Sequence, residues 1–163
     1  MIGSFDWSAF IDAIARLGVA AALGGVLGLE RELSGHWAGL RTHMLVAVGA
    51  AVFIVAGTLL GADHPDAVSR IVQGVATGIG FLGAGTILKL GDQQEIKGLT
   101  TASSIWLAAA LGTAAGLAAY ELAAAALVVS LFVLAVLRPV EGRLGRSHHH
   151  HEKPPGAHDP KAK

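Results

Sequence analysis

Four long segments without a charged residue constrain this sequence more than any other feature. Asp, Glu, Lys and Arg are absent from residues 17–29, 46–62, 71–88 and 99–120. The chain is 53% apolar and only 15% charged, whereas soluble domains average about 25% charged residues. The sequence therefore predicts a helical membrane protein rather than a water-soluble domain.

The number of membrane spans follows from their length. A helix needs about 20 apolar residues, and at least about 17, to cross the hydrocarbon layer. Five segments qualify, at about 8–29, 42–60, 68–88, 101–117 and 121–137. We expect one all-α domain, a compact bundle of about five transmembrane helices over residues 1–141, and a disordered cytoplasmic tail over 142–163. Residues 99–137 as one helix would be about 58 Å long, so we expect a tight turn near Gly116, Tyr120 and Glu121.

The distribution of basic residues predicts the orientation. With five spans and the amino terminus outside, the inner segments are 30–41, 89–98 and the tail from 138. They hold ten of the twelve basic residues, Arg31, Arg41, Lys89, Lys97, Arg138, Arg143, Arg146, Lys153, Lys161 and Lys163. This bias matches the positive-inside rule and places the carboxyl terminus in the cytoplasm. The first apolar segment lacks a basic n-region, so we interpret it as a retained helix and not a signal peptide.

Several functional classes are not expected. The chain has no cysteine, which removes disulfides and thiolate chemistry, and its net charge of zero gives no electrostatic case for nucleic acid. No known catalytic motif is present, so we expect neither an enzyme nor a cofactor. The run His148–His151 lies in the low-complexity tail and has no fixed geometry for a metal, so no metal site is predicted.

Glycine is abundant, with 22 residues, and predicts close helix contacts. Small residues four apart let helix backbones approach one another in lipid. GxxxG pairs occur in four spans, at Gly24 and Gly28, Gly57 and Gly61, Gly74 and Gly78, and Gly112 and Gly116. The third span also holds Gly80, Gly83 and Gly85. Two interpretations remain open: a crowded helix at the centre of the bundle, which we favour, or a break at Gly80–Gly85 that lines a cavity.

Two charged residues fall inside the first span. Arg16 and Asp12 are four residues apart, so they can neutralise each other on one helix face. A structural ion pair near the outer interface is slightly favoured over a polar entrance or an ion relay, because the arginine can reach the headgroups.

A second group of polar residues gathers at the predicted inner edge of the membrane, and we treat it as a candidate functional cluster. Glu30 and Glu32 do not help orientation, so we expect them to pair with Arg41 or Lys97. Thr100 or Thr101 is expected to cap the fourth helix, although hydroxyls and free N–H groups at a helix start can also bind an anion. The full candidate set, with the outer pair, is Asp12, Arg16, Glu30, Arg31, Glu32, Arg41, Thr42, Lys97, Thr100 and Thr101.

Tryptophans mark the membrane borders. Trp7 and Trp37 fall at predicted interfaces, where indole rings anchor, whereas Trp106 lies within the fourth span and is expected to pack against other helices.

Four ordered sequence blocks carry a family resemblance. They are Gly28–Glu32 (GLERE), Ala38–Val46 (AGLRTHMLV), Gly78–Ile87 (GIGFLGAGTI) and Ile96–Trp106 (IKGLTTASSIW). With these blocks the chain strongly resembles the MgtC/SapB family of bacterial inner-membrane proteins over about residues 17–137. The resemblance implies a small helical bundle in the cytoplasmic membrane. Many members carry an ACT-like soluble domain after the helices, where this sequence has only a short tail.

The resemblance also implies a function. Well-known members are virulence factors linked to magnesium limitation and stress, and they act by modulating other membrane proteins. We therefore expect a regulatory or interaction role, with the lipid bilayer and other inner-membrane proteins as partners. The alternative is a small homo-oligomeric transporter or channel for Mg²⁺ or protons, since five short spans can hardly enclose a wide pore alone.

Overall fold

The computed structural model describes residues 5–60, 66–90 and 95–144 and contains five helices joined by short connections. The order is α1 (Trp7–Leu33), α2 (Leu40–Leu60), α3 (Asp66–Ala84), β1 (Leu88–Leu90), β2 (Glu95–Lys97), α4 (Leu99–Gly116) and α5 (Tyr120–Leu144). Four of them, α1, α2, α3 and α5, are long and apolar enough to cross a membrane. The prediction of a helical membrane bundle is confirmed, but α4, the fourth of the five predicted spans, is not among the helices that could cross a membrane, and a two-stranded hairpin precedes it.

The chain divides into two compact units, residues 1–129 and 130–163, so that the second half of α5 belongs to the second unit. The predicted tail from residue 145 onward, including His148–His151, lies outside the described residues. The expected turn between the last two spans is present, because α4 ends at Gly116 and α5 begins at Tyr120.

Asp6 fixes the start of α1. Its Oδ1 accepts hydrogen bonds from the backbone N–H of Ser8 at 2.9 Å, the Ser8 hydroxyl at 2.7 Å and the N–H of Ala9 at 3.2 Å. These bonds satisfy donors that a helix start leaves free. The hydroxyl of Ser8 and the two backbone groups lower the pKa of the Asp6 carboxyl below its usual value.

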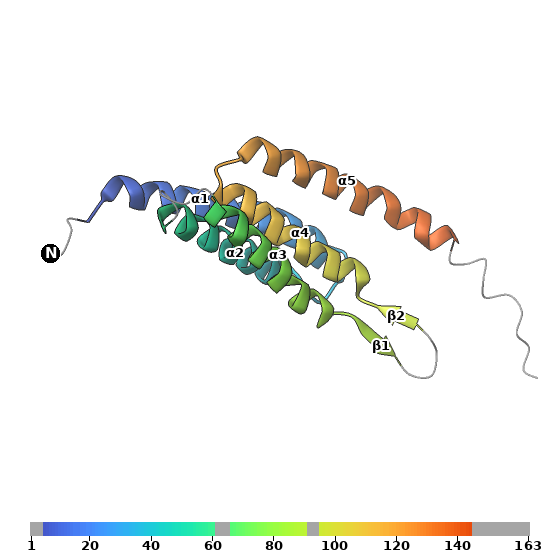
Figure 1. Cartoon of the computed structure of the whole chain (residues 1–163). Helices are drawn as coiled ribbons and strands as arrows, with labels where there is room; N and C mark the ends of the chain where they lie inside the picture. The colour runs from blue at the N-terminus through green and yellow to red at the C-terminus, as the bar shows by residue number, and fades with distance from the viewer. Residues whose placement is uncertain (1–4, 61–65, 91–94, 145–163) are drawn as a thin grey trace, which may run out of the picture. The chain divides into compact units, whose positions relative to one another are not determined.

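The first unit is built around α2 and α4, which pack against each other and against both α1 and α3 (Figure 1). Glycine makes this close contact possible. A Cβ on Gly24 would lie 2.6 Å from the His43 carbonyl oxygen of α2, and one on Gly28 would lie 2.8 Å from Leu40 Cα. A Cβ on Gly112 of α4 would overlap the backbone of Ala47. The helices meet through small residues, among them the buried alanines Ala20, Ala47, Ala51 and Ala115.

The position of the third helix differs from the prediction. The central helix is α4, which holds ten buried residues, whereas α3 buries only Ile79 and Gly83. A Cβ on Gly74, Gly78 or Gly80 would meet nothing within 4 Å. The close packing that was expected of the third span is therefore found in α4, where Ala, Ser and Gly supply the small residues. Of the alternative break at Gly80–Gly85, the structure shows only the end of the helix, since α3 runs without interruption to Ala84 and the chain then turns at Gly85.

A short hairpin replaces the end of the predicted third span and the inner loop that follows it. β1 and β2 pair antiparallel, with Leu88 opposite Lys97, Lys89 opposite Ile96 and Leu90 opposite Glu95. Gly98 then begins α4 with a positive φ of 98°, and a side chain there would collide with the Thr86 carbonyl. The cap of α4 is thus Gly98, and the prediction of Thr100 or Thr101 is wrong because the chain leaves the hairpin in a left-handed turn that requires glycine.

Trp106 packs only in part. It is 51% exposed on α4, and it lines a cavity together with Val72 of α3 and Leu122 of α5. The buried face of α4 holds Ile105, Ala108 and Leu111 instead.

Candidate functional site

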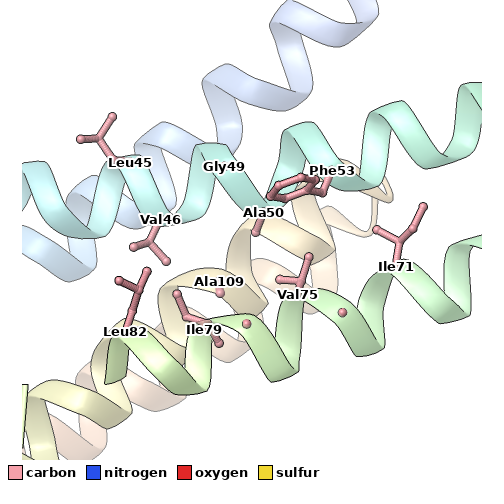
Figure 2. Close-up of a pocket in the computed structure, with 12 residues that line it drawn as sticks. Leu45, Val46, Gly49, Ala50, Phe53, Ile71, Val75, Ile79, Leu82 and Ala109 are labelled. Atoms are coloured by element: carbon pink, nitrogen blue, oxygen red, sulfur yellow. The ribbon is translucent and has the colours of Figure 1, made fainter. Parts of the chain in front are cut away.

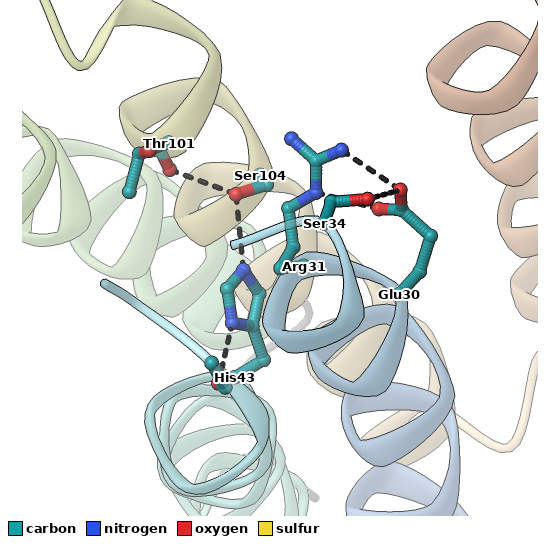
Figure 3. A network of polar contacts seen from close by, with 7 residues as sticks. Glu30, Arg31, Ser34, His43, Thr101 and Ser104 are labelled. Atoms are coloured by element: carbon teal, nitrogen blue, oxygen red, sulfur yellow. Dashed lines mark hydrogen bonds and ion pairs between the residues drawn. The ribbon is translucent and has the colours of Figure 1, made fainter. Parts of the chain in front are cut away.

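Four polar side chains are almost completely buried at one end of the first unit. Arg31 is 2% exposed, His43 0%, Thr101 3% and Ser104 3%. They come from the last turns of α1, the first turn of α2 and the first turns of α4, which meet at this end of the bundle (Figure 3). Buried polar groups are costly unless they are hydrogen-bonded, so their partners decide what this site can do.

Arg31 forms the charged part of this network. Its Nε donates to Glu30 Oε2 at 2.6 Å and its NH2 group to Glu30 Oε1 at 3.0 Å, while the Ser34 hydroxyl donates to the same Oε1 at 2.7 Å. The NH1 group of Arg31 is buried and has no hydrogen-bond partner within the described part of the chain. The expected pairing of Glu30 with Arg41 or Lys97 is therefore wrong, because its sequence neighbour already holds both carboxylate oxygens.

His43 forms the neutral part of the network and joins α2 to α4. Its Nδ1 lies 2.9 Å from the Gly39 carbonyl, and its Nε2 lies 3.0 Å from the Ser104 hydroxyl. A carbonyl can only accept, so Nδ1 carries the hydrogen, and in a neutral imidazole Nε2 then accepts from Ser104. The Ser104 hydroxyl also donates to the Thr101 carbonyl at 2.9 Å, so its single hydrogen is shared between this oxygen and His43 Nε2. A side-chain hydrogen bond between two buried residues thus joins α2 to α4.

The remaining inner candidates have local roles or face outward. Glu32 Oε2 accepts the N–H of Leu40 at 2.8 Å, which satisfies a free donor at the start of α2. The side chains of Arg41, Thr42, Lys97 and Thr100 are exposed. Of the predicted inner cluster, the structure brings together Glu30, Arg31 and Thr101.

Asp12 and Arg16 form an ion pair away from this network. Arg16 Nε lies 2.8 Å from Asp12 Oδ2, and Arg16 NH1 donates to the Gly116 carbonyl at 2.9 Å. The arginine therefore binds a free carbonyl at the end of α4, where a positive charge is favoured by the helix dipole. This arrangement fits the structural interpretation of the pair.

The sequence reasoning missed three members of the network, His43, Ser104 and Ser34. Two of them offered a signal, since His43 and Ser104 lie in the sequence blocks quoted above and are polar residues within helices of mostly apolar composition. Their partnership spans 61 residues of sequence, so that only packing of α2 on α4 could reveal it.

In the part of the chain that the structure describes, two apolar cavities border α3. The larger, of about 670 Å³, lies between α2 and α3 and reaches Ala109 of α4 (Figure 2). It is lined by side chains such as Val46, Phe53, Val75 and Leu82 and carries no charged residue. A smaller cavity of about 210 Å³ on the other side of α3 is lined by residues such as Val72, Trp106 and Leu122, with Thr113 as its polar member.

Comparison with known proteins settles the family. A model described as the MgtC family matches residues 17–143. The chain belongs to the MgtC family. Members of this family are bacterial inner-membrane proteins, and with its candidate membrane-spanning helices this chain is a multi-pass protein of that membrane.

Named relatives are identical to this member of the MgtC family at about two fifths of the aligned positions. It is 42% identical over 143 residues to the "Putative magnesium transporter YhiD" of Escherichia coli, covering 84% of this chain and 66% of that protein. It is 42% identical over 134 residues to "Protein MgtC" of Brucella abortus, covering 82% of this chain and 55% of that protein. It also matches "Protein SrpB" of Synechococcus elongatus at 42% identity, over 75% of this chain and 71% of that protein. The chain thus spans between half and two thirds of the length of the first two. No solved structure matches it.

Proposed function

We propose that this chain is a regulatory or interaction protein of the bacterial inner membrane, linked to magnesium limitation or stress and to virulence, and that it acts on other membrane proteins without catalysing a reaction. The link to magnesium comes from the family and from the relative named as a putative magnesium transporter. The observation that carries the regulatory role is the buried polar network, in which Arg31 pairs with Glu30 of its own helix and His43 joins α2 to α4.

The character of the interior supports the same proposal. Mg²⁺ is bound by carboxylates and water in roomy polar sites. In the described residues no three His, Asp or Glu side chains gather to hold a metal ion, and the two cavities beside α3 are lined almost wholly by apolar groups. A bundle with such an apolar interior is better suited to binding partner proteins than to conducting ions.

The alternative is a small oligomeric transporter or channel for Mg²⁺ or protons. The printed name of the Escherichia coli relative favours it, as does the charged pair Asp12 and Arg16 inside the span of α1. It requires a path between several copies, since the described cavities of one copy are apolar.

Reconstitution separates the two proposals. Purified protein in liposomes should move neither Mg²⁺, K⁺ nor protons above the rate of protein-free liposomes, measured with entrapped fluorescent indicators. Affinity capture from membranes of cells grown in low magnesium should recover a specific membrane protein that is weaker or absent after growth in high magnesium. Saturable Mg²⁺ or proton flux that depends on the protein would overturn the regulatory proposal in favour of the transporter.

A further inference from the structure

A polar stripe runs along α3 on the side that faces away from the rest of the bundle. Its members recur every three or four residues, the spacing of one helix face. All of them are exposed, namely Asp66, Ser69, Arg70, Gln73, Thr77 and Gly80. None of the sites described above includes this stripe.

The opposite face of α3 accounts for its contacts with the bundle. Ile79 is buried, and Ile71, Val75, Ile79 and Leu82 point into the cavity shared with α2 (Figure 2). None of the polar members of the stripe lines either cavity beside α3. The helix is therefore amphipathic in the reverse sense for a membrane, with apolar residues inward and polar residues toward lipid.

Gln73 is the deepest member of the stripe whose side chain has no hydrogen-bond partner in the described part of the chain. It lies seven residues after Asp66 in a helix that qualifies as a membrane span, or about 10 Å along the axis at 1.5 Å per residue. Within the described residues its side-chain amide makes no hydrogen bond, whereas the Thr77 hydroxyl donates to the Gln73 carbonyl at 2.8 Å. An amide without a partner in hydrocarbon is unfavourable, so this face needs a polar cover.

We propose that the cover is a second copy of the chain, with α3 packed against α3 about a two-fold axis along the membrane normal. A glutamine amide has both donors and an acceptor, so two Gln73 side chains can bond to each other across such an axis. The stripe carries one acid, Asp66, and one base, Arg70, so that it is neutral and each arginine can reach the aspartate of the other copy. Gly80, beside which an added Cβ would find open space, lets the two backbones approach.

Disulfide cross-linking tests this arrangement directly, because the natural chain has no cysteine. In native membranes, full-length Gln73→Cys, Thr77→Cys and Gly80→Cys should each form a covalent dimer under mild oxidation. Leu82→Cys is the matched control, since Leu82 is also exposed on α3 but lies on the cavity face, and it should remain monomeric. Equal cross-linking of all four variants would show random collision and overturn the proposal.

A second experiment measures the contribution of the amide. In liposomes at varied protein-to-lipid ratio, energy transfer between labelled copies should show dimers, and Gln73→Leu should weaken dimerisation at least about threefold, the average effect of interhelical hydrogen bonds in membranes. Gln73→Asn, which keeps the amide, should lose less, and circular dichroism should show unchanged helix content in both.

Two outcomes contradict the second copy as occupant. One is a monomer by single-molecule photobleaching of the natural chain in liposomes at every protein-to-lipid ratio. The other is cross-linking of the stripe cysteines in native membranes to a different protein and not to another copy. A monomer would also count against the transporter alternative, which requires several copies, but it leaves the regulatory proposal unchanged, and the flux experiment alone tests that proposal.

Discussion

Arg31 is a cation that has almost no contact with solvent, and its environment explains why Glu30 is its neighbour. A buried arginine without an anion would be strongly destabilising, whereas a paired one is tolerated. Glu30 supplies both carboxylate oxygens to Arg31, and Ser34 holds the carboxylate in place. The pair therefore acts as a unit at the end of α1.

The first prediction concerns this unit. Glu30→Gln should lower the free energy of unfolding by about 1–3 kcal/mol, because the buried guanidinium loses its anionic partner. Arg31→Met, which replaces the charge by an apolar chain of similar length, should cost clearly less. Thermal unfolding of both variants in detergent micelles measures the difference. If Arg31→Met is as damaging as Glu30→Gln or more so, the pair stabilises the bundle in its own right.

The second prediction concerns the bond between α2 and α4. Ser104→Ala should destabilise the protein by about 1–3 kcal/mol, because it leaves Nε2 of the fully buried His43 without a partner. Ser103→Ala is the matched control, since Ser103 is the exposed neighbour and its hydroxyl bonds only to the Leu99 carbonyl. Its effect should stay within about 0.5 kcal/mol. Similar losses for both serines would show that the His43 contact adds no stability.

At the scale of elements, the contact between α2 and α4 depends on the absence of side chains. Gly112 faces the Ala47 backbone, and Gly116 faces Ala51 and Ile54. Because lipid is as apolar as the helices themselves, close van der Waals contact holds them together in place of the hydrophobic effect. A methyl group at such a position forces the two helices apart.

The third prediction follows from this contact. Gly112→Ala should destabilise the bundle by about 3 kcal/mol, because the new methyl group overlaps backbone atoms that cannot move aside. Gly18→Ala is the control on α1, where an added Cβ would meet nothing within 4 Å. It should be neutral or stabilising by up to about 1 kcal/mol through helix propensity. Denaturant titration followed by circular dichroism measures both, and equal stability of the two variants would refute the close contact.

At the scale of the whole molecule, orientation in the membrane is the remaining prediction from charge. Ten of the twelve basic residues lie in segments assigned to the cytoplasm, so a green fluorescent protein joined after residue 163 should fluoresce, and alkaline phosphatase joined there should be inactive. Phosphatase joined after residue 62, on the predicted outer side, should be active. The reverse pattern of activity would invert the topology.

The sequence was sufficient for the class of protein because that class depends on composition along the chain. Charge-free segments of membrane length predicted a helical bundle, and Gly116 and Tyr120 marked the turn before α5. The four sequence blocks indicated the family that the comparison then established. Each of these conclusions rests on residues that are close together in sequence.

The tertiary structure alone decided which residues share an environment. In the folded bundle Glu30 pairs with Arg31 and not with Arg41 or Lys97. His43 bonds to Ser104, which lies 61 residues later in the sequence, and the central helix is α4 and not α3. Such pairings depend on which helix faces meet. The glycines and polar residues of two helices are compatible with several packing arrangements, and the sequence does not distinguish among them. Apolar segments of the sequence predict where a membrane helix lies, whereas its contacts with other helices are known only from the tertiary structure.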